Sequence, residues 1–283
     1  MTEFTEIADG VHVLVYPYLR VNCTLITGET GALLVDTLST GTQARELHEA
    51  VLRVTTKPLG IVNTHFHFDH CFGNATLAGP ATPIWGHQEC ARELRENGLA
   101  WQRVWEQELL GDDERIAREV GLTAIKPPNT EVAREDLVDI GGRLVKVSWH
   151  GRGHTAGDLV VRVDDVLVAG DLVEEGAPPG FADAFPLDWP ETLRALATAA
   201  GPDTVVVPGH GEIVDAEFLN IAHDELAALD WLIREAHGDG GDVAKVAAAS
   251  SLSRWGAAGL REAEHAVRRG YAQLDAATPN VLS

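Results

Sequence analysis

The chain has 283 residues, 45% of them apolar, which is enough for one large domain or two closely joined layers. Its 22 lysines and arginines against 43 aspartates and glutamates give a formal charge of −21, which disfavours a nucleic-acid partner. The three cysteines form no CxxC pair, no apolar run is as long as a membrane span, and the first residues lack the apolar core of a signal peptide. We therefore expect a cytoplasmic protein with no membrane partner and no disulfide framework.

Hydrophobic patterning predicts strands and helices in a mixed order. Short β-branched apolar runs between turn residues indicate strands, and apolar residues at helical spacing indicate helices. In chain order we expect strands at 11–15, 22–26 and 32–36, a helix at 42–54, strands at 59–64 and 83–86, helices at 87–97 and 99–120 with a break near 111, strands at 144–149, 159–163 and 166–169, a helix at 190–200, a strand at 204–207, and helices at 216–236 and 260–274. Many neighbouring strands are joined by hairpin-length turns. The order therefore favours an α/β (α+β) fold in which two mixed sheets are covered by helices on their outer faces.

The most informative segment is His65-Phe66-His67-Phe68-Asp69-His70, which carries three imidazoles and one carboxylate within six residues. Imidazole and carboxylate groups are ligands that zinc, iron and manganese accept. His65 and His67 alternate with Phe66, so in an extended backbone both rings point the same way. Asp69 and His70 follow as the chain turns and can face a second point. The segment can therefore offer two ligands to each of two metal ions.

Three later segments repeat one pattern, in which an apolar strand ends in a ligand-type residue beside glycine. His154 follows Gly151-Arg152-Gly153, Asp171 follows Ala169-Gly170, and His210 stands between Gly209 and Gly211. Glycine lets the backbone turn sharply and approach a metal without a Cβ clash. Their joint occurrence with the six-residue motif marks His154, Asp171 and His210 as further candidate ligands.

The order His65, His67, Asp69, His70, His154, Asp171, His210 resembles the HxHxDH pattern of metallo-β-lactamase-fold hydrolases, over roughly residues 11–215. The resemblance implies a four-layer αββα sandwich with the metal site along one edge between the sheets. By analogy, His65, His67 and His154 hold one metal ion. Asp69, His70 and His210 hold the other, and Asp171 bridges the two. Asp36 matches the family's first motif, and we expect it to support a ligand histidine; the alternative is that it caps the helix after Leu38.

The resemblance also implies a single domain over 1–283, with a helical insertion at about 87–135 and extra C-terminal helices at about 216–275. We expect the substrate pocket to come from the insertion and from the loop after Asp171. Trp101 and Trp105 lie four residues apart on one predicted helix and could line an apolar cleft, although packing on the sheet is the favoured interpretation. Phe181 and Phe185 follow a Pro/Gly-rich loop and could belong to a lid.

Position 171 bears on the expected activity. In this resemblance true β-lactamases usually carry Cys or Ser there, whereas a bridging aspartate is typical of thioesterases, lactonases and phosphodiesterases. We expect a metal-dependent hydrolase that cleaves a thioester, ester, lactone or amide of a small molecule by a metal-bridged hydroxide, with Asp69 orienting the hydroxide and accepting its proton.

The expected cofactors are two divalent metal ions, with Zn²⁺ first and Fe or Mn as alternatives. A mononuclear-iron persulfide dioxygenase and a genuine β-lactamase are the alternative functions. The sequence also leaves a homodimer open.

Overall fold

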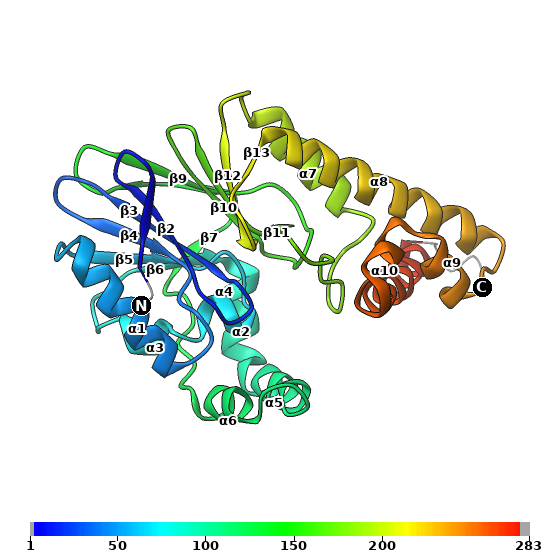
Figure 1. Ribbon diagram of the computed structural model, residues 1–283, viewed down its shortest axis with the longest axis horizontal. Coiled ribbons are helices and arrows are strands. Elements are labelled where there is room, and N and C mark those ends of the chain that lie inside the picture. Colours follow the sequence, from blue (N-terminus) through cyan, green and yellow to red (C-terminus); the bar gives the residue numbers. More distant parts are fainter. Residues whose placement is uncertain (1–2, 278–283) are drawn as a thin grey trace, which may run out of the picture.

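The computed structural model describes residues 3–277, which fold into four layers (Figure 1). Two β-sheets face each other, and helices lie on both outer faces. The αββα sandwich expected from the sequence is therefore confirmed. The layering follows from the strands, which bury β-branched side chains on both faces and so need a partner layer on each side.

Within the described residues, the first sheet runs in chain order and is antiparallel at its start and parallel afterwards. Its strands are β1 (Thr5–Ala8), β2 (Val11–Val15), β3 (Asn22–Thr27), β4 (Ala32–Val35), β5 (Leu59–Val62), β6 (Ile84–His87) and β7 (Thr130–Val132). Neighbouring strands pair antiparallel from β1 through β4 and parallel from β4 through β7. The segments after β4, β5 and β6 therefore emerge at one edge of the sheet.

The second sheet has the order β13-β12-β11-β10-β9-β8 over the part of the chain that is described. Its strands are β8 (Glu135–Asp139), β9 (Leu144–Trp149), β10 (Leu159–Val163), β11 (Val166–Glu174), β12 (Val205–His210) and β13 (Val214–Asp215). β11 and β12 are parallel, so both end at the same edge, and the register between them shifts beside Gly170. Gly170 has φ of +55°, a backbone conformation that glycine adopts without steric cost.

Apolar clusters between neighbouring layers hold the fold together. The core between the sheets is rich in strand valines, such as Val35 and Val62 from the first sheet and Val161 and Val207 from the second. A second core lies on the outer face of the second sheet, where Trp189 and its neighbours pack between the strands and the C-terminal helices, and a third packs the helix Gly41–Val54 on the first sheet. Burying one such side chain contributes about 1.5–3 kcal/mol, so the patterning of the strands dominates the choice of fold.

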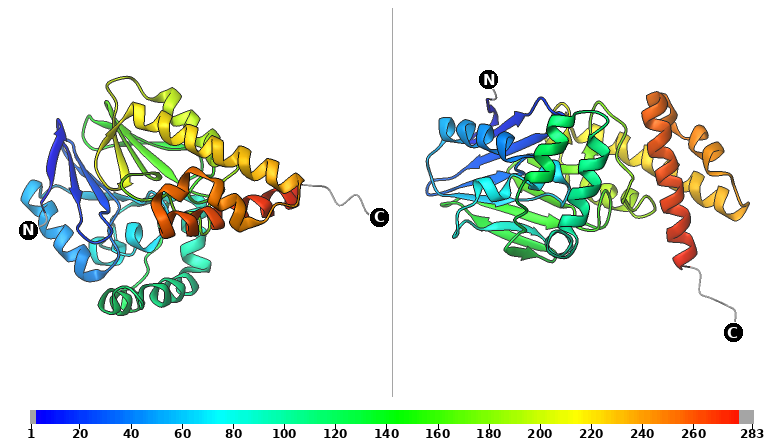
Figure 2. Two further views of the ribbon diagram at one scale, coloured as in Figure 1. Left: turned by 45° about the vertical axis from the view of Figure 1, so that its right-hand side comes forward. Right: turned by 90° about the horizontal axis from the view of Figure 1, so that it is seen from below.

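The helices divide into three groups. α1 (Gly41–Val54), α2 (Phe68–Cys71) and α3 (Asn74–Leu77) accompany the first sheet, and α4 (Gln88–Glu96), α5 (Gly98–Leu109) and α6 (Glu114–Leu122) form an insertion before β7. α7 (Trp189–Ala199) and α8 (Ala216–Gly238) pack together beside the second sheet. α8 leads into a lobe with α9 (Val243–Ala249), the 3₁₀ helix η1 (Ser251–Trp255) and α10 (Gly256–Ala277) at one side of the molecule (Figure 2). Among residues 3–277, no helix has the length and apolarity to cross a bilayer.

The structure departs from the predicted elements mainly in the strands. β1, β7, β8 and β13 were not predicted; β8 has the sequence Glu-Asp-Leu-Val-Asp and is mostly exposed, so its apolar alternation is weak. The strand predicted to end at residue 169 continues to Glu174 as β11, so Asp171 lies within a strand and not after one. α9 is also absent from the predicted elements, because it is only seven residues long and directly follows a glycine-rich segment that indicates a break; Asp242 caps it.

A buried polar network fixes the chain on both sides of α2. Asn74 is fully buried and its Oδ1 accepts from Thr37 Oγ1 and Asn63 Nδ2, each at 3.0 Å. The Asn74 Nδ2 group donates to Asn63 Oδ1 at 2.7 Å and to the Lys126 carbonyl at 3.0 Å. Every polar atom of the Asn74 side chain thus has a partner, which is what a buried amide requires.

We expect Asn74→Ala to destabilise the fold by about 2–4 kcal/mol, because it leaves several buried partners without a hydrogen bond. Urea unfolding followed by circular dichroism measures the change. Asn220→Ala, on the exposed face of α8, is the matched control and is expected to change stability by less than about 0.5 kcal/mol. Equal midpoints for the two variants would contradict the role of the network.

Candidate metal centre

The six-residue motif lies directly after β5, at the edge where β4 also ends. The chain leaves β5 at Val62, and His67 is the N-cap residue of α2, so Asp69 and His70 fall inside this short helix. His65 and His70 are fully buried, and Asp69 is 6% exposed. The chain bends at residues 64–66 and enters α2 at Phe68, so Asp69 and His70 follow a change of chain direction, which the sequence predicts as a turn.

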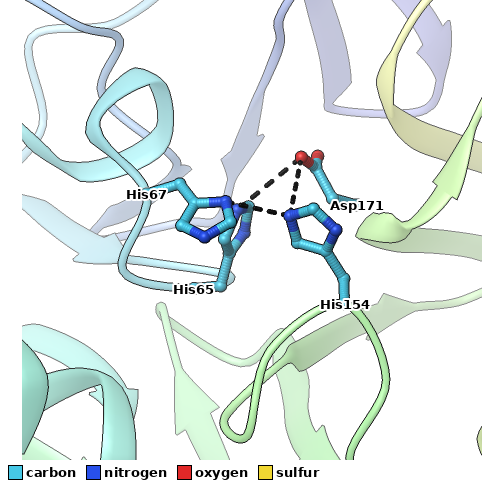
Figure 3. Close-up of side chains that lie close together, drawn as sticks. All are labelled: His65, His67, His154 and Asp171. Atoms are coloured by element: carbon cyan, nitrogen blue, oxygen red, sulfur yellow. Dashed lines mark hydrogen bonds and ion pairs between the residues drawn. The ribbon is translucent and has the colours of Figure 1, made fainter. Parts of the chain in front are cut away.

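One group of candidate ligands consists of His65, His67, His154 and Asp171, whose ligand atoms all lie within 4.8 Å of one another (Figure 3). We call its three histidines the first set. His154 comes from the loop after β9, and Asp171 from β11. His67 Nδ1 is 2.9 Å from His154 Nε2, and Asp171 Oδ2 lies 3.4 Å from His154 Nε2 and 3.6 Å from His65 Nε2.

A neighbouring group consists of Asp69, His70 and His210, which we call the second set; its ligand atoms also lie within 4.8 Å of one another. The two Nε2 atoms of His70 and His210 are 3.2 Å apart, and Asp69 Oδ2 lies 3.4 Å from His210 Nε2. Asp171 reaches this set as well, with Oδ1 3.2 Å from His70 Nε2 and Oδ2 3.3 Å from His210 Nε2. The Asp171 carboxylate thus lies between the two sets.

The tight approach of β12 to Asp171 depends on glycine. A Cβ atom at Gly209 would lie 1.7 Å from Asp171 Oδ1, a distance at which no side chain fits. Gly209 immediately precedes His210 at the end of β12. The glycine next to a candidate ligand therefore makes room for the Asp171 carboxylate.

In each histidine of the first set, one ring nitrogen faces the other ligands, and the other, which we call the outward nitrogen, makes a hydrogen bond. His67 Nε2 donates to both carboxylate oxygens of Asp183 at 3.1 Å, and His154 Nδ1 donates to the Gly180 carbonyl at 3.2 Å. His65 Nδ1 lies 3.0 Å from Thr64 Oγ1, whose own proton goes to Asp36 Oδ2 at 2.7 Å, so the hydroxyl oxygen accepts from the imidazole. These bonds fix the tautomer of all three rings.

The second set is supported in the same way. His70 Nδ1 donates to Asp36 Oδ2 at 2.8 Å, and His210 Nδ1 donates to the Leu19 carbonyl at 2.8 Å. Asp36 also accepts from the backbone N–H of Thr64 at 2.8 Å. The N-cap of α1 is Thr40, whose side chain accepts from Gln43, so Asp36 does not cap that helix.

These outward bonds leave five inward nitrogens as lone pairs when the imidazoles are neutral. His67 Nδ1 then faces His154 Nε2 at 2.9 Å, and His70 Nε2 faces His210 Nε2 at 3.2 Å, with no proton between either pair. His65 Nε2 and Asp171 Oδ1 are buried and lack any hydrogen-bond partner. Opposed lone pairs and unpaired buried acceptors are costly, and a cation in each set relieves both problems. The residues present therefore fit divalent metal binding.

The electrostatics of the metal-free centre are dominated by burial and by its carboxylates. Burial lowers the pKa of the His154 imidazole to about 4, which keeps the ring in its neutral, metal-binding form. Burial also acts to lower the pKa of His210, but Asp171 and Asp69 outweigh it and raise that pKa to about 10. Burial acts to raise the pKa of Asp171, but the surrounding histidines hold it well below its ordinary value. The Asp171 carboxylate is thus charged and attracts a positive partner, which can be a proton on His210 or a metal ion.

Apart from Asp36, sequence reasoning missed the groups that support the histidines. Asp183 lies in the stretch expected near the metals, but nothing in its spacing distinguished it from other aspartates. Leu19 and Gly180 act through backbone carbonyls, which leave no side-chain signal. Leu19 has φ of +57°, unusual for a branched residue, and this conformation accompanies the carbonyl contact with His210.

The four aromatic residues that we expect near the substrate pocket have different surroundings. Trp105 is 8% exposed and packs against Phe66 and His67 of the motif, with ring centroids 6.0 and 5.7 Å apart, so it supports the motif from behind. Trp101 stacks on Trp105 and donates to Glu93.

The expectation that Phe181 lines a pocket is wrong for this structure. Its ring is fully buried against Trp189, because the chain turns inward after the Pro/Gly loop and the backbone N–H of Phe181 binds Glu262. Phe185 borders a groove of about 910 Å³ between β9 and α4, where the Arg152 guanidinium lies 4.4 Å from its ring centroid.

Comparison with known proteins places the chain in a family. The model of the metallo-beta-lactamase superfamily matches residues 16–210, which include every candidate ligand. The chain belongs to the metallo-beta-lactamase superfamily. Members of this superfamily are mostly metal-dependent hydrolases, and the His/Asp clusters support the same chemistry here.

Curated and solved relatives agree with the family assignment. A type 2 metallo-beta-lactamase from Bacillus cereus is 24% identical over 204 residues, covering 70% of each chain. An acyl-coenzyme A thioesterase from Homo sapiens is 27% identical over 229 residues, covering 71% of this chain and 76% of its own. The solved structure of a stereoselective inverting sec-alkylsulfatase from Pseudomonas sp. has a TM-score of 0.75 at 17% identity, covering 99% of this chain and 51% of its own. This last likeness concerns the fold alone.

We expect Asp36→Asn to lower the zinc affinity of the second set by about 10–100-fold, because it weakens the acceptor that orients His70. Zinc content after dialysis against a metal buffer, measured by plasma mass spectrometry, reports the loss. Asp164→Asn is the control, since Asp164 is an exposed turn residue paired with Arg143, and asparagine tolerates its positive φ. Retention of as much zinc in Asp36→Asn as in the control would contradict the assignment.

Proposed function

We propose that the protein is a dinuclear zinc hydrolase that cleaves a carbonyl-type bond of a small molecule, with a thioester as the first candidate. The observation that carries the proposal is the Asp171 carboxylate lying between two sets of inward-facing imidazole nitrogens. A carboxylate shared by two ligand sets suits two ions a few ångströms apart, the arrangement used to hydrolyse carbonyl and phosphoryl bonds.

The residues divide the work of such a site. Bound metal ions would supply a water of lowered pKa and would stabilise negative charge on the carbonyl oxygen. The first set and the second set would each hold one ion, and Asp171 would contribute a carboxylate to both. Asp69 is the proposed proton acceptor, because its carboxylate is almost buried and faces the interior of the centre beside His210.

The choice of a thioester rests on two supports. One relative is an acyl-coenzyme A thioesterase that aligns over most of both chains. The other is Asp171 itself, since an aspartate at this position is typical of the hydrolases that do not act on β-lactams, whereas true β-lactamases usually carry Cys or Ser there. Esters, lactones and amides share the same attacked carbonyl and are the neighbouring candidates.

Two other functions are tested alongside. A β-lactamase activity is favoured by the similarity to the Bacillus cereus enzyme. A persulfide dioxygenase would need one iron ion and would leave the second set without use, although that set has its outward bonds in place.

The deciding experiment is metal analysis followed by a substrate panel. Protein purified without added metal is expected to contain up to two zinc ions per chain and to hydrolyse a short acyl-coenzyme A thioester faster than a lactone or a chromogenic β-lactam. Removal of metal by a chelator should abolish the activity, and zinc should restore it. One iron per chain with oxygen uptake on a persulfide would overturn the proposal, and preferred cleavage of the β-lactam would replace the thioester by the second candidate.

Asp171→Ala tests the bridging role. We expect bound zinc to fall from two ions per chain to one or fewer, and hydrolysis to fall by on the order of a hundredfold or more, since one carboxylate serves both sets. Asp230→Ala is the control, because Asp230 pairs with Arg234 on the surface of α8. Unchanged zinc content and hydrolysis in Asp171→Ala would reject the bridge.

A further inference from the structure

The loop that joins β11 to α7 touches two candidate ligands from outside the centre. Its Gly180 carbonyl accepts from His154 Nδ1 at 3.2 Å, and its Asp183 carboxylate accepts from His67 Nε2 at 3.1 Å. Asp183 is thus aimed at the ring nitrogen opposite the one that faces the other ligands. One short segment therefore orients two of the three histidines in the first set.

The same loop is held in place by α10. Glu262 Oε2 accepts from the Phe181 backbone N–H at 3.0 Å. Arg269 donates from Nε to the Ala184 carbonyl and from Nη2 to the Asp183 carbonyl, both at 2.9 Å. Arg269 also lies over the Phe185 ring, 5.4 Å from its centroid. The guanidinium therefore fixes the backbone at the residue whose carboxylate binds His67.

The contacts come from one face of α10. Glu262 and Arg269 are seven residues apart, about two helical turns, and Gln273 is four residues further on and accepts from the Leu187 backbone N–H at 3.3 Å. The contacts of this helix face span the part of the loop from Phe181 to Leu187. α10 begins at Gly256, well beyond residues 16–210 that match the family model.

We propose that α10 is part of the metal centre: through Arg269 it positions Asp183, and through Asp183 it sets the orientation of His67 and the metal affinity of the first set. The inference rests on the proposed metal centre. Asp183 and Arg269 are positioning residues, because neither directs an atom toward the space between the ligands. Outer partners of metal-binding histidines typically contribute 10–100-fold to affinity, which is the size of effect expected here.

Arg269→Met is the decisive variant, since methionine keeps an apolar stem over Phe185 and removes all the donors. Arg268→Met is its matched control: Arg268 is the adjacent residue on α10, is 63% exposed and pairs with Glu264 on its own helix. Zinc binding is measured by competition with a chromophoric chelator on the full-length, metal-free protein. We expect Arg269→Met to weaken one of the two zinc-binding steps about tenfold or more and to leave the other within about twofold of the control.

Asp183→Asn is the second variant, because it keeps the size of the side chain and removes its charge. It is expected to weaken the same zinc-binding step as Arg269→Met and to alter the absorption spectrum of the cobalt-substituted protein, whereas Arg268→Met leaves that spectrum unchanged. Unfolding midpoints of the metal-free variants report any loss of fold, and Asp183→Asn carries the test if Arg269→Met does not fold.

The outcomes separate this inference from the proposed function. Wild-type protein that binds no zinc would defeat the proposed centre itself. Wild-type protein that binds two zinc ions while both variants bind them as tightly as Arg268→Met would overturn the role of α10 alone. Weakening of both binding steps to the same extent would also overturn it, since that result indicates a general loss of structure.

Discussion

Five histidines and two aspartates direct their ring nitrogens and carboxylates into one largely buried space between the two sheets, and the rest of the structure depends on this constraint. Each unpaired buried acceptor costs about 1–3 kcal/mol, and facing lone pairs add repulsion. The rings stay in place because their outward nitrogens donate to groups that cannot rotate away, including two backbone carbonyls. Because the outward nitrogens carry the protons, the inward nitrogens of neutral rings present lone pairs, and a cation between them is favoured.

The two sheets share the work of building this space. In the first sheet, β4 and β5 are parallel, so Asp36 after β4 lies beside Thr64 after β5 and joins the outer partners of His65 and His70 into one unit. In the second sheet, β11 and β12 are parallel, so Asp171 and His210 meet at the facing edge. Neither sheet holds a complete ligand set alone. The centre therefore depends on the core of valines that sets the spacing between the sheets.

Much of the fold and the candidate ligands could be predicted because their signals are local. Two histidines in alternation, a carboxylate and a third histidine within one turn, and glycine beside each later ligand are all visible in short windows. The supporting groups are not local: Asp183 and His67 are 116 residues apart, and a carbonyl such as that of Leu19 has no residue-specific signature. Phe181 shows the same limit, because a loop carries no periodicity from which its buried direction could be predicted.

The loop between β11 and α7 is also fixed by hydrogen bonds to the outer side of the ligands, and these bonds bear on whether it can open as a lid. A lid over the metal site would have to move away from it. Moving this loop breaks the hydrogen bond of Gly180 to His154 and that of Asp183 to His67. It also breaks the two hydrogen bonds that the backbone carbonyls of Asp183 and Ala184 accept from Arg269. Hydrogen bonds with a charged partner contribute about 1.5–3 kcal/mol each, and the buried Phe181 ring adds its own cost. Opening would also release two ligands from their orienting partners when a substrate needs them in position. The contacts of this loop therefore favour a fixed support for His67 and His154 over a lid that opens.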